Sequence, residues 1–208
     1  MYPAFNLARN GFHVVLPDAV QHGERKQKDI DLRLMNVILK TVVEINQIID
    51  SFSQDDCVDT TRIGMGGISM GGMITFKYLT GKDMRIKAAI TTISTPEWVS
   101  PIASQRVVAL VKSINPHYSQ EDLKKDMDYA SSIQPVDEYK TMIGVPLLIQ
   151  NGEADDIIPV EVVRDFYNKL SEDSDNKEAV QIITYPGVGH TYTAEMEAQL
   201  IAWFKKYI

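Results

Sequence analysis

The chain of 208 residues has a single cysteine, Cys57. One thiol cannot form a disulfide within the chain, and no cysteine pair with the spacing of a thiolate zinc site is possible. The sequence therefore predicts neither a disulfide framework nor a structural metal centre.

Long apolar runs are also lacking. No stretch of the sequence approaches the roughly 18 apolar residues that a membrane-spanning helix needs. The first residues do not show the basic segment followed by an apolar segment that is typical of a secretory signal. We therefore expect a cytoplasmic protein that does not act at a membrane.

Positive charge is in the minority. Lysine and arginine contribute 21 residues against 28 acidic ones, which gives a net charge of -7 at pH 7. Nucleic acids and anionic membrane surfaces both favour a basic patch on their partners, so neither is expected to bind here. The chain is 44% apolar and long enough to bury one core, which predicts a single domain over residues 1–208.

Apolar runs alternate with amphipathic helical patterns along most of this domain. Such alternation is typical of an α/β protein with a largely parallel sheet flanked by helices. The run at 12–18 predicts a first strand that is buried on both faces. Further strands are predicted at 63–67, 86–93, 145–150 and 180–185, and helices at 4–10, 34–52, 73–79, 160–170 and 196–207.

The alternation stops between residues 94 and 141. An apolar helical pattern at 107–114 and a charged helix that begins at Ser119 occupy this stretch, and Ser119 and Asp122 have the spacing of a capping box. An insertion of this size predicts a lid, which we place at 95–141. The alternative is an elaborated connection without a role in binding.

The residues from Gly67 to Gly71 read Gly-Ile-Ser-Met-Gly, between a predicted strand and a predicted helix. This pattern in this context is the nucleophile elbow, which exposes the hydroxyl of its serine, Ser69, at a sharp turn. We expect both glycines to be required because a Cβ at either position would obstruct the turn. A phosphate-binding turn is the alternative, but the glycine and lysine spacings of such loops are absent.

Two further residues follow the ends of predicted strands. Asp155 comes after the strand at 145–150, and His190 comes after the strand at 180–185. The carboxyl ends of parallel strands meet at one edge of a sheet, and the order Ser69, Asp155, His190 is the one associated with the elbow. On chemistry alone, the neighbouring Asp156 is equivalent to Asp155.

The other three histidines are weaker candidates. His13 falls within the strand predicted at 12–18, where we expect a core residue, and His117 falls in the predicted lid. His22 lies in the loop after that strand, where it either lines a substrate pocket or has a structural role.

The chain resembles α/β-hydrolase-fold serine esterases of the dienelactone-hydrolase and prolyl-oligopeptidase-like branch. The matching segments are 11–18 with the following His-Gly, 67–72, 151–159 and 187–190. The resemblance implies an α/β-hydrolase fold in which Ser69 is the nucleophile, Asp155 the orienting acid and His190 the general base, without metal or cofactor. In this family the acid stands four residues before the proline of its turn, which selects Asp155 over Asp156.

The resemblance also indicates how a substrate would be held. The backbone N–H of Met70 is the expected first donor to the oxyanion. The side chains of Met70 and Trp98 are candidates for the floor of an acyl pocket, with His22 nearby, and ordinary packing is the alternative for both Met70 and Trp98.

One strand of the family pattern has no counterpart in the sequence. It would lie between the strand predicted at 12–18 and that at 63–67, before Met1 in chain order, and the loop after it would supply the second oxyanion donor. Either the chain lacks an N-terminal portion, which we favour, or the two strands pair directly. We therefore expect residues 1–208 alone to be poorly stable or poorly active.

Together these features predict a carboxylic-ester hydrolase that acts on small acyl esters through an acyl-enzyme. A prolyl-oligopeptidase-like serine peptidase is one alternative, because the same three residues also cleave amides. A hydrolase-fold module that binds a small ligand or a partner without catalysis is the other.

Overall fold

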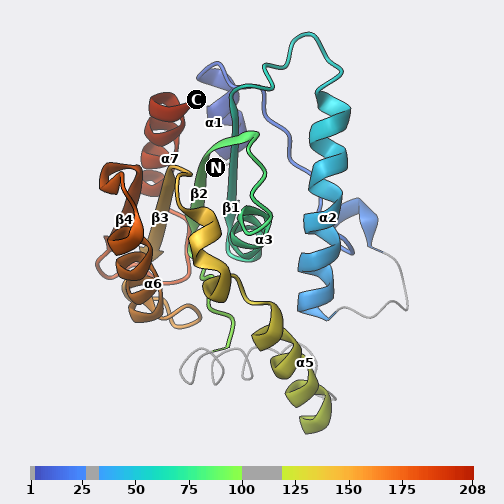
Figure 1. Cartoon of the computed structure of the whole chain (residues 1–208), viewed down its shortest axis with the longest axis vertical. Helices are drawn as coiled ribbons and strands as arrows, with labels where there is room; N and C mark the ends of the chain where they lie inside the picture. Colours follow the sequence, from blue (N-terminus) through green and yellow to red (C-terminus); the bar gives the residue numbers. More distant parts are fainter. Residues whose placement is uncertain (1–2, 27–32, 100–118) are drawn as a thin grey trace.

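The computed structural model describes residues 3–26, 33–99 and 119–208. Within these ranges, four strands form one parallel sheet in the order β1-β2-β3-β4 (Figure 1). The chain therefore adds each strand beside the previous one. The strands are β1 (Ile63–Ile68), β2 (Ile86–Thr92), β3 (Leu147–Gly152) and β4 (Val180–Tyr185).

Helices cover both faces of this sheet. One face packs against α2 (Leu34–Phe52), α3 (Met70–Leu79) and α6 (Val160–Asp173), and the other packs against α1 (Pro3–Arg9) and α7 (Ala194–Tyr207). Because successive side chains of a strand point to opposite faces, Ala89 joins the first core, whereas its neighbours Ala88 and Ile90 join the second. The double cover explains why β2 and β3 are almost wholly buried.

The predicted strands at 63–67, 86–93, 145–150 and 180–185 are confirmed, the last with the same bounds and the others with shifts of up to two residues at their ends. The charged helix is α5 (Gln120–Ile133), and the hydroxyl of Ser119 accepts a hydrogen bond from the N–H of Asp122, as the capping pattern predicts. The short helices are η1 (Gly23–Arg25), η2 (Pro135–Met142) and η3 (Lys177–Ala179). The helix predicted at 107–114 lies outside the described residues.

The prediction of a strand at 12–18 is wrong, because this segment does not pair with any strand of the sheet. Its first residues pack against helices instead: the ring of Phe12 lies edge-on to Phe204 of α7 at 6.3 Å, and the ring of His13 lies edge-on to Phe52 of α2 at 5.9 Å. Val15 and Leu16 are 37% and 72% exposed, and His13 is exposed rather than a core residue. An apolar run is buried on both faces only where a neighbouring strand and two helical layers enclose it, and β1 pairs with β2 alone among the described strands.

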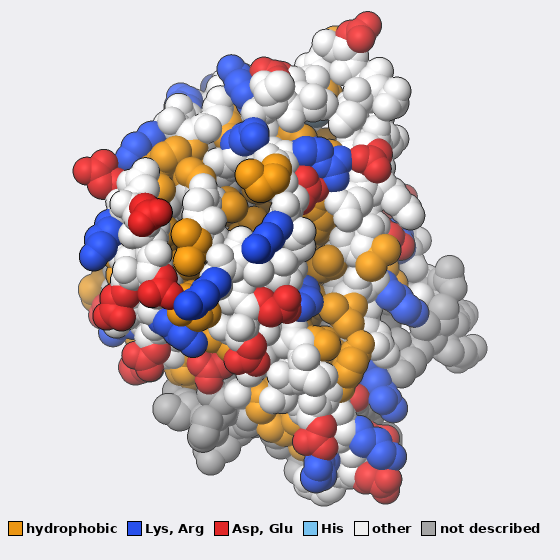
Figure 2. All heavy atoms as spheres, viewed as in Figure 1, with side chains coloured by type: hydrophobic (Ala, Val, Ile, Leu, Met, Phe, Trp, Pro, Cys, Tyr) orange, Lys and Arg blue, Asp and Glu red, His pale blue; other side chains and the backbone are white. Residues whose placement is uncertain are grey.

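The surface carries mixed charge. Figure 2 shows acidic and basic side chains interspersed over one face of the molecule, between smaller groups of apolar ones. None of the helices in the described ranges has the length and apolar character that crossing a membrane requires.

Candidate active site

Ser69 is the single residue between the end of β1 and the start of α3, and its backbone has a conformation that non-glycine residues rarely adopt. Its φ is 53° and its ψ is -116°. The N–H of Ser69 donates a hydrogen bond to the carbonyl of Thr92 at the end of β2, with a distance of 2.9 Å. A strained serine held at a strand-to-helix turn is the geometry that the elbow motif predicts.

Close backbone approaches explain two of the glycines around Ser69. A Cβ on Gly67 would lie 2.1 Å from the carbonyl of Gly71, and a Cβ on Gly72 would lie 2.5 Å from the Cβ of Ser94. A Cβ on Gly71 would meet nothing within 4 Å, so the expectation that Gly71 must lack a side chain is wrong. The steric requirement falls on Gly72 because α3 packs directly against the segment that follows β2.

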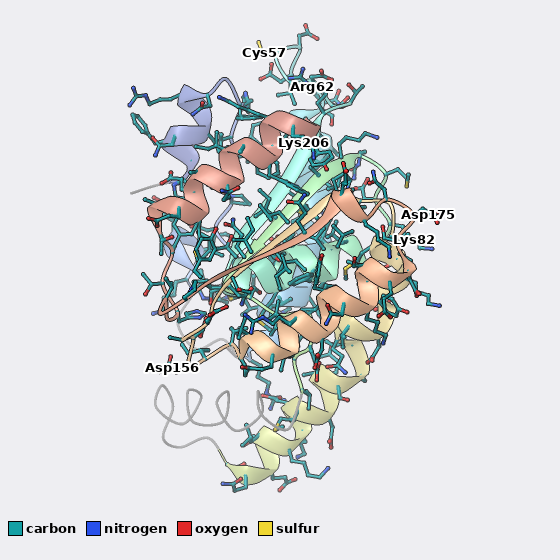
Figure 3. The ribbon with its side chains drawn as sticks, turned by 90° about the vertical axis from the view of Figure 1, so that its left-hand side faces the viewer. Cys57, Arg62, Lys82, Asp156, Asp175 and Lys206 are labelled. Carbon is teal, nitrogen blue, oxygen red and sulfur yellow. The ribbon has the colours of Figure 1, made fainter. Side chains whose placement is uncertain are left out.

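Asp155 occupies the turn after β3. Its Oδ1 accepts hydrogen bonds from the N–H groups of Ile157 and Ile158, both at 2.8 Å, and its side chain is fully buried. Burial by itself raises the pKa of this carboxyl, but the hydrogen bonds from His190 and from the two amides outweigh burial and hold the pKa below its ordinary value. Asp155 is therefore kept as a carboxylate. Asp156 is exposed, and Figure 3 shows it at the edge of the ribbon.

His190 lies in the turn after β4, and backbone contacts join this turn to the turn of Asp155. The N–H of Glu153 donates to the carbonyl of Tyr185, and the N–H of Ala154 donates to the carbonyl of Val188, both at 2.9 Å. Gly152 allows this contact because a Cβ there would lie 2.1 Å from the carbonyl oxygen of Val188. The two turns are thus held at a fixed separation.

Two hydrogen bonds connect the three predicted residues. The Oγ of Ser69 lies 2.8 Å from Nε2 of His190, and Nδ1 of His190 lies 2.8 Å from Oδ2 of Asp155. A carboxylate only accepts hydrogen bonds, so Nδ1 carries the proton and Nε2 is free to accept the serine hydroxyl. The structure brings Ser69, His190 and Asp155 together in the order needed for proton transfer from serine to histidine.

The N-terminus of α3 lies beside the serine. The first hydrogen bonds of this helix run from the N–H groups of Gly72 and Met73 to the carbonyl of Ser69. The amide of Met70 precedes them, and the N–H groups at the start of a helix have no acceptor within the helix itself. Together with the positive end of the helix dipole, this makes Met70 a suitable donor to a developing oxyanion.

The two residues predicted to bind substrate lie in different surroundings. Trp98 is 5% exposed and packs with Ile38, Ile74 and Ala130 in a cluster that Met70 borders. His22 is exposed, and its Nδ1 lies 3.0 Å from the carbonyl of Val20. Within the described residues, neither side chain hydrogen bonds to Ser69, His190 or Asp155, and Trp98 is linked to the elbow through the packing of Met70.

Sequence reasoning missed Gln150, a fully buried residue of β3. Its Nε2 donates to the carbonyl of Met196 in α7, and its Oε1 accepts from the hydroxyl of Tyr185 at 2.6 Å. Burial raises the pKa of Tyr185 to about 12, so this hydroxyl remains a donor. The only sequence signal was a polar residue within a buried run.

In the described ranges, no cluster of histidine, cysteine and acidic residues could hold a metal ion.

The parallel sheet, its two helical layers and the serine at the strand-to-helix turn define an α/β-hydrolase fold. The family model "Prolyl oligopeptidase family" matches residues 5–208, and the chain belongs to this family of hydrolases. The resemblance inferred from the motifs is thereby confirmed.

Individual relatives agree with this membership. The chain is 29% identical to YitV of Bacillus subtilis (strain 168) over 217 residues, which cover all of this chain and 83% of YitV. It is 24% identical to the protein named Esterase YjfP of Escherichia coli (strain K12), over all of this chain and 82% of that protein. The crystal structure of TT1662 from Thermus thermophilus has the same fold, with a TM-score of 0.75 and 17% identity over 98% of this chain and 80% of TT1662.

Proposed function

We propose that this protein hydrolyses carboxylic esters of small acyl groups, with Ser69 as nucleophile, His190 as general base and Asp155 as the orienting acid. The observation that carries the proposal is the pair of 2.8 Å hydrogen bonds from Ser69 to His190 and from His190 to Asp155. The name of the relative YjfP, an esterase, supports the choice of ester over other acyl substrates.

In the first half of the proposed reaction, the Oγ of Ser69 attacks the ester carbonyl carbon while its proton passes to Nε2 of His190. The carbonyl electron pair moves to oxygen, and the amide of Met70 donates a hydrogen bond to that oxyanion. Asp155 holds the imidazole in the required tautomer and stabilises the imidazolium. The intermediate then collapses, and the leaving alkoxide takes the proton from Nε2, which releases an alcohol and leaves an acyl group on Ser69.

In the second half, water replaces the alcohol. Nε2 of His190 accepts a proton from water as its oxygen attacks the acyl carbon, and collapse returns the proton to Oγ of Ser69. The products are the carboxylic acid and the free enzyme. We propose small acyl groups because Met70, the residue after the nucleophile, borders the apolar cluster that contains the buried Trp98.

A fluorophosphonate probe tests the nucleophile, because it forms a covalent bond only with an activated serine. We expect the wild-type protein to be labelled and Ser69→Ala and His190→Ala to lose labelling. Ser132→Ala is the matched control, since this serine lies on α5 and its hydroxyl donates to the carbonyl of Tyr129 on the same helix. Failure to label folded wild-type protein would contradict the proposal and favour a binding module without catalysis.

The substrate class needs a second measurement. We expect turnover of p-nitrophenyl acetate to exceed that of p-nitrophenyl octanoate, and both to depend on Ser69. The family match also makes a peptidase the second candidate. Faster cleavage of peptide p-nitroanilides than of the acetate ester would favour that candidate over the esterase.

A further inference from the structure

The residue after β2, Ile93, has a backbone conformation that its residue type disfavours. Its φ is 45°, and it is 3% exposed. Four non-glycine residues of the described chain have a positive φ, namely Gln21, Ser69, Lys82 and Ile93. Ile93 is the only β-branched one among them, and a positive φ is most costly for a β-branched side chain. The surrounding packing must therefore impose this conformation.

The peptide group that joins Thr92 to Ile93 bridges two parts of the active site. Its carbonyl accepts the hydrogen bond from the N–H of Ser69 at 2.9 Å, and its N–H donates to the carbonyl of Gln150 at 2.7 Å. Gln150 belongs to β3, the strand that leads into the turn of Asp155. One peptide group thus connects Ser69 to β3, the strand that precedes Asp155.

The turn at Ile93 also places the next residue beneath α3. Ser94 is fully buried, and its carbonyl accepts a hydrogen bond from the side-chain amide of Asn151. The Cβ of Ser94 lies so close to Gly72 that this position of α3 has room only for glycine. The first turn of α3, which contains the amide of Met70, therefore rests on the segment that Ile93 directs.

We infer that Ile93 is a positioning residue for the nucleophile and the oxyanion donor. Packing around its side chain holds the left-handed turn. This turn sets the position of Ser69 and of the first turn of α3 relative to His190. In the proposed reaction Ile93 supplies no reacting group. The effect that we expect on catalysis rests on the proposed function. The effect that we expect on amide hydrogen exchange rests on the backbone geometry alone.

The test compares Ile93→Gly with Ile93→Val. Glycine adopts a positive φ without strain, but it has no side chain to pack and can also adopt many other conformations, so the turn is no longer imposed; valine keeps a branched, buried side chain. We expect kcat for p-nitrophenyl acetate, expressed per titrated active site, to fall at least tenfold in Ile93→Gly with KM changed less than threefold. Ile93→Val should retain kcat within threefold.

Lys82→Gly is the control for strain alone. Lys82 has a φ of 54° but is exposed and follows α3 at its far end, so glycine there should leave kcat unchanged. If Ile93→Gly is too unstable to purify, Ile93→Ala takes its place in the same comparison. Wild-type kcat per active site in the glycine or alanine variant would overturn the inference and assign Ile93 a packing role only.

Amide hydrogen exchange gives a readout that does not depend on catalysis. In Ile93→Gly we expect the amide of Ser69 to exchange at least tenfold faster, while the amide of Ala89 in the middle of β2 keeps its protection. Equal acceleration at both amides would indicate general destabilisation and contradict the inference. If wild-type protein shows no esterase activity, the proposed function fails, and this measurement still decides the role of Ile93.

Discussion

The carboxylate of Asp155 and the imidazole of His190 lie 2.8 Å apart, while the equally acidic neighbour Asp156 is exposed to solvent. The difference comes from the turn after β3, in which the amides of Ile157 and Ile158 hold the other oxygen of Asp155. Asp155 is thereby fixed by three hydrogen bonds before any substrate binds.

Exchanging each aspartate for asparagine should separate their roles. We expect Asp155→Asn to lower kcat for p-nitrophenyl acetate by about 10⁴-fold, because an amide at this position favours the wrong tautomer of His190. Asp156→Asn is the matched control and should stay within about threefold of wild type, since the side chain is exposed. Comparable losses in the two variants would contradict the assignment of Asp155 as the orienting acid.

A second carboxylate, Asp83, makes stability depend on pH. Hydrogen bonds from Arg85 lower the pKa of Asp83, against the opposing effect of burial and with further help from the hydroxyl of Tyr78. Arg85 also donates to Asp50 on α2, so the network ties the end of α3 to α2. The pKa of Asp83 in the folded state lies below its pKa in the unfolded state, which is about 4. The stabilisation is therefore complete at pH values above about 4, and it is lost as the pH falls through the pKa of the folded state.

We therefore expect Asp83→Asn to lower the free energy of unfolding at pH 7 by about 1–3 kcal/mol, the range for hydrogen bonds to charged groups. The difference from wild type should shrink as the pH is lowered below about 4. Urea unfolding at pH 7 and at pH 3 measures both quantities. Asp128→Asn, which breaks an exposed ion pair with Lys124, should change stability by less than about 1 kcal/mol at either pH. A difference for Asp83→Asn that grows toward acid would contradict this account.

Two glycines four residues apart should respond oppositely to the same substitution. We expect Gly67→Ala to destabilise the protein by about 1–3 kcal/mol, because the new methyl group would collide with the backbone of Gly71. In Gly71→Ala the methyl group meets open space on a helix, where alanine is favoured over glycine by up to about 1 kcal/mol. Thermal unfolding of the two variants measures this contrast, and similar melting temperatures would show that the elbow tolerates a side chain at both positions.

The arrangement of the candidate site was predictable because parallel strands end at one edge of the sheet. Ser69, Asp155 and His190 each follow a strand whose apolar run is visible in the sequence, and the sheet order then brings the three turns together. The segment 12–18 shows the limit of the same reasoning. Its apolar residues indicate an extended segment but do not specify a pairing partner, and the segment contacts α7 and the end of α2 instead of joining the sheet.

Other features had no sequence signal because tertiary packing imposes them. Isoleucine favours extended strands, so nothing in the sequence suggests a left-handed turn at Ile93. Likewise, the motif contains Gly71, but the contact with Ser94 that requires glycine falls one residue later, at Gly72. Only the positions of the neighbouring backbone atoms distinguish the two glycines.

The backbone bonds between the turns after β3 and β4 hold Asp155 and His190 together as one unit of the candidate site. Asp155 and His190 follow the adjacent strands β3 and β4, and backbone bonds of Glu153 and Ala154 join their turns, whereas Ser69 follows β1, which β2 separates from β3. The proton-accepting pair can therefore assemble without any contribution from position 69. A cysteine or another nucleophile placed there would meet a histidine that is already oriented, so the identity of the attacking atom can change while its partner pair is preserved.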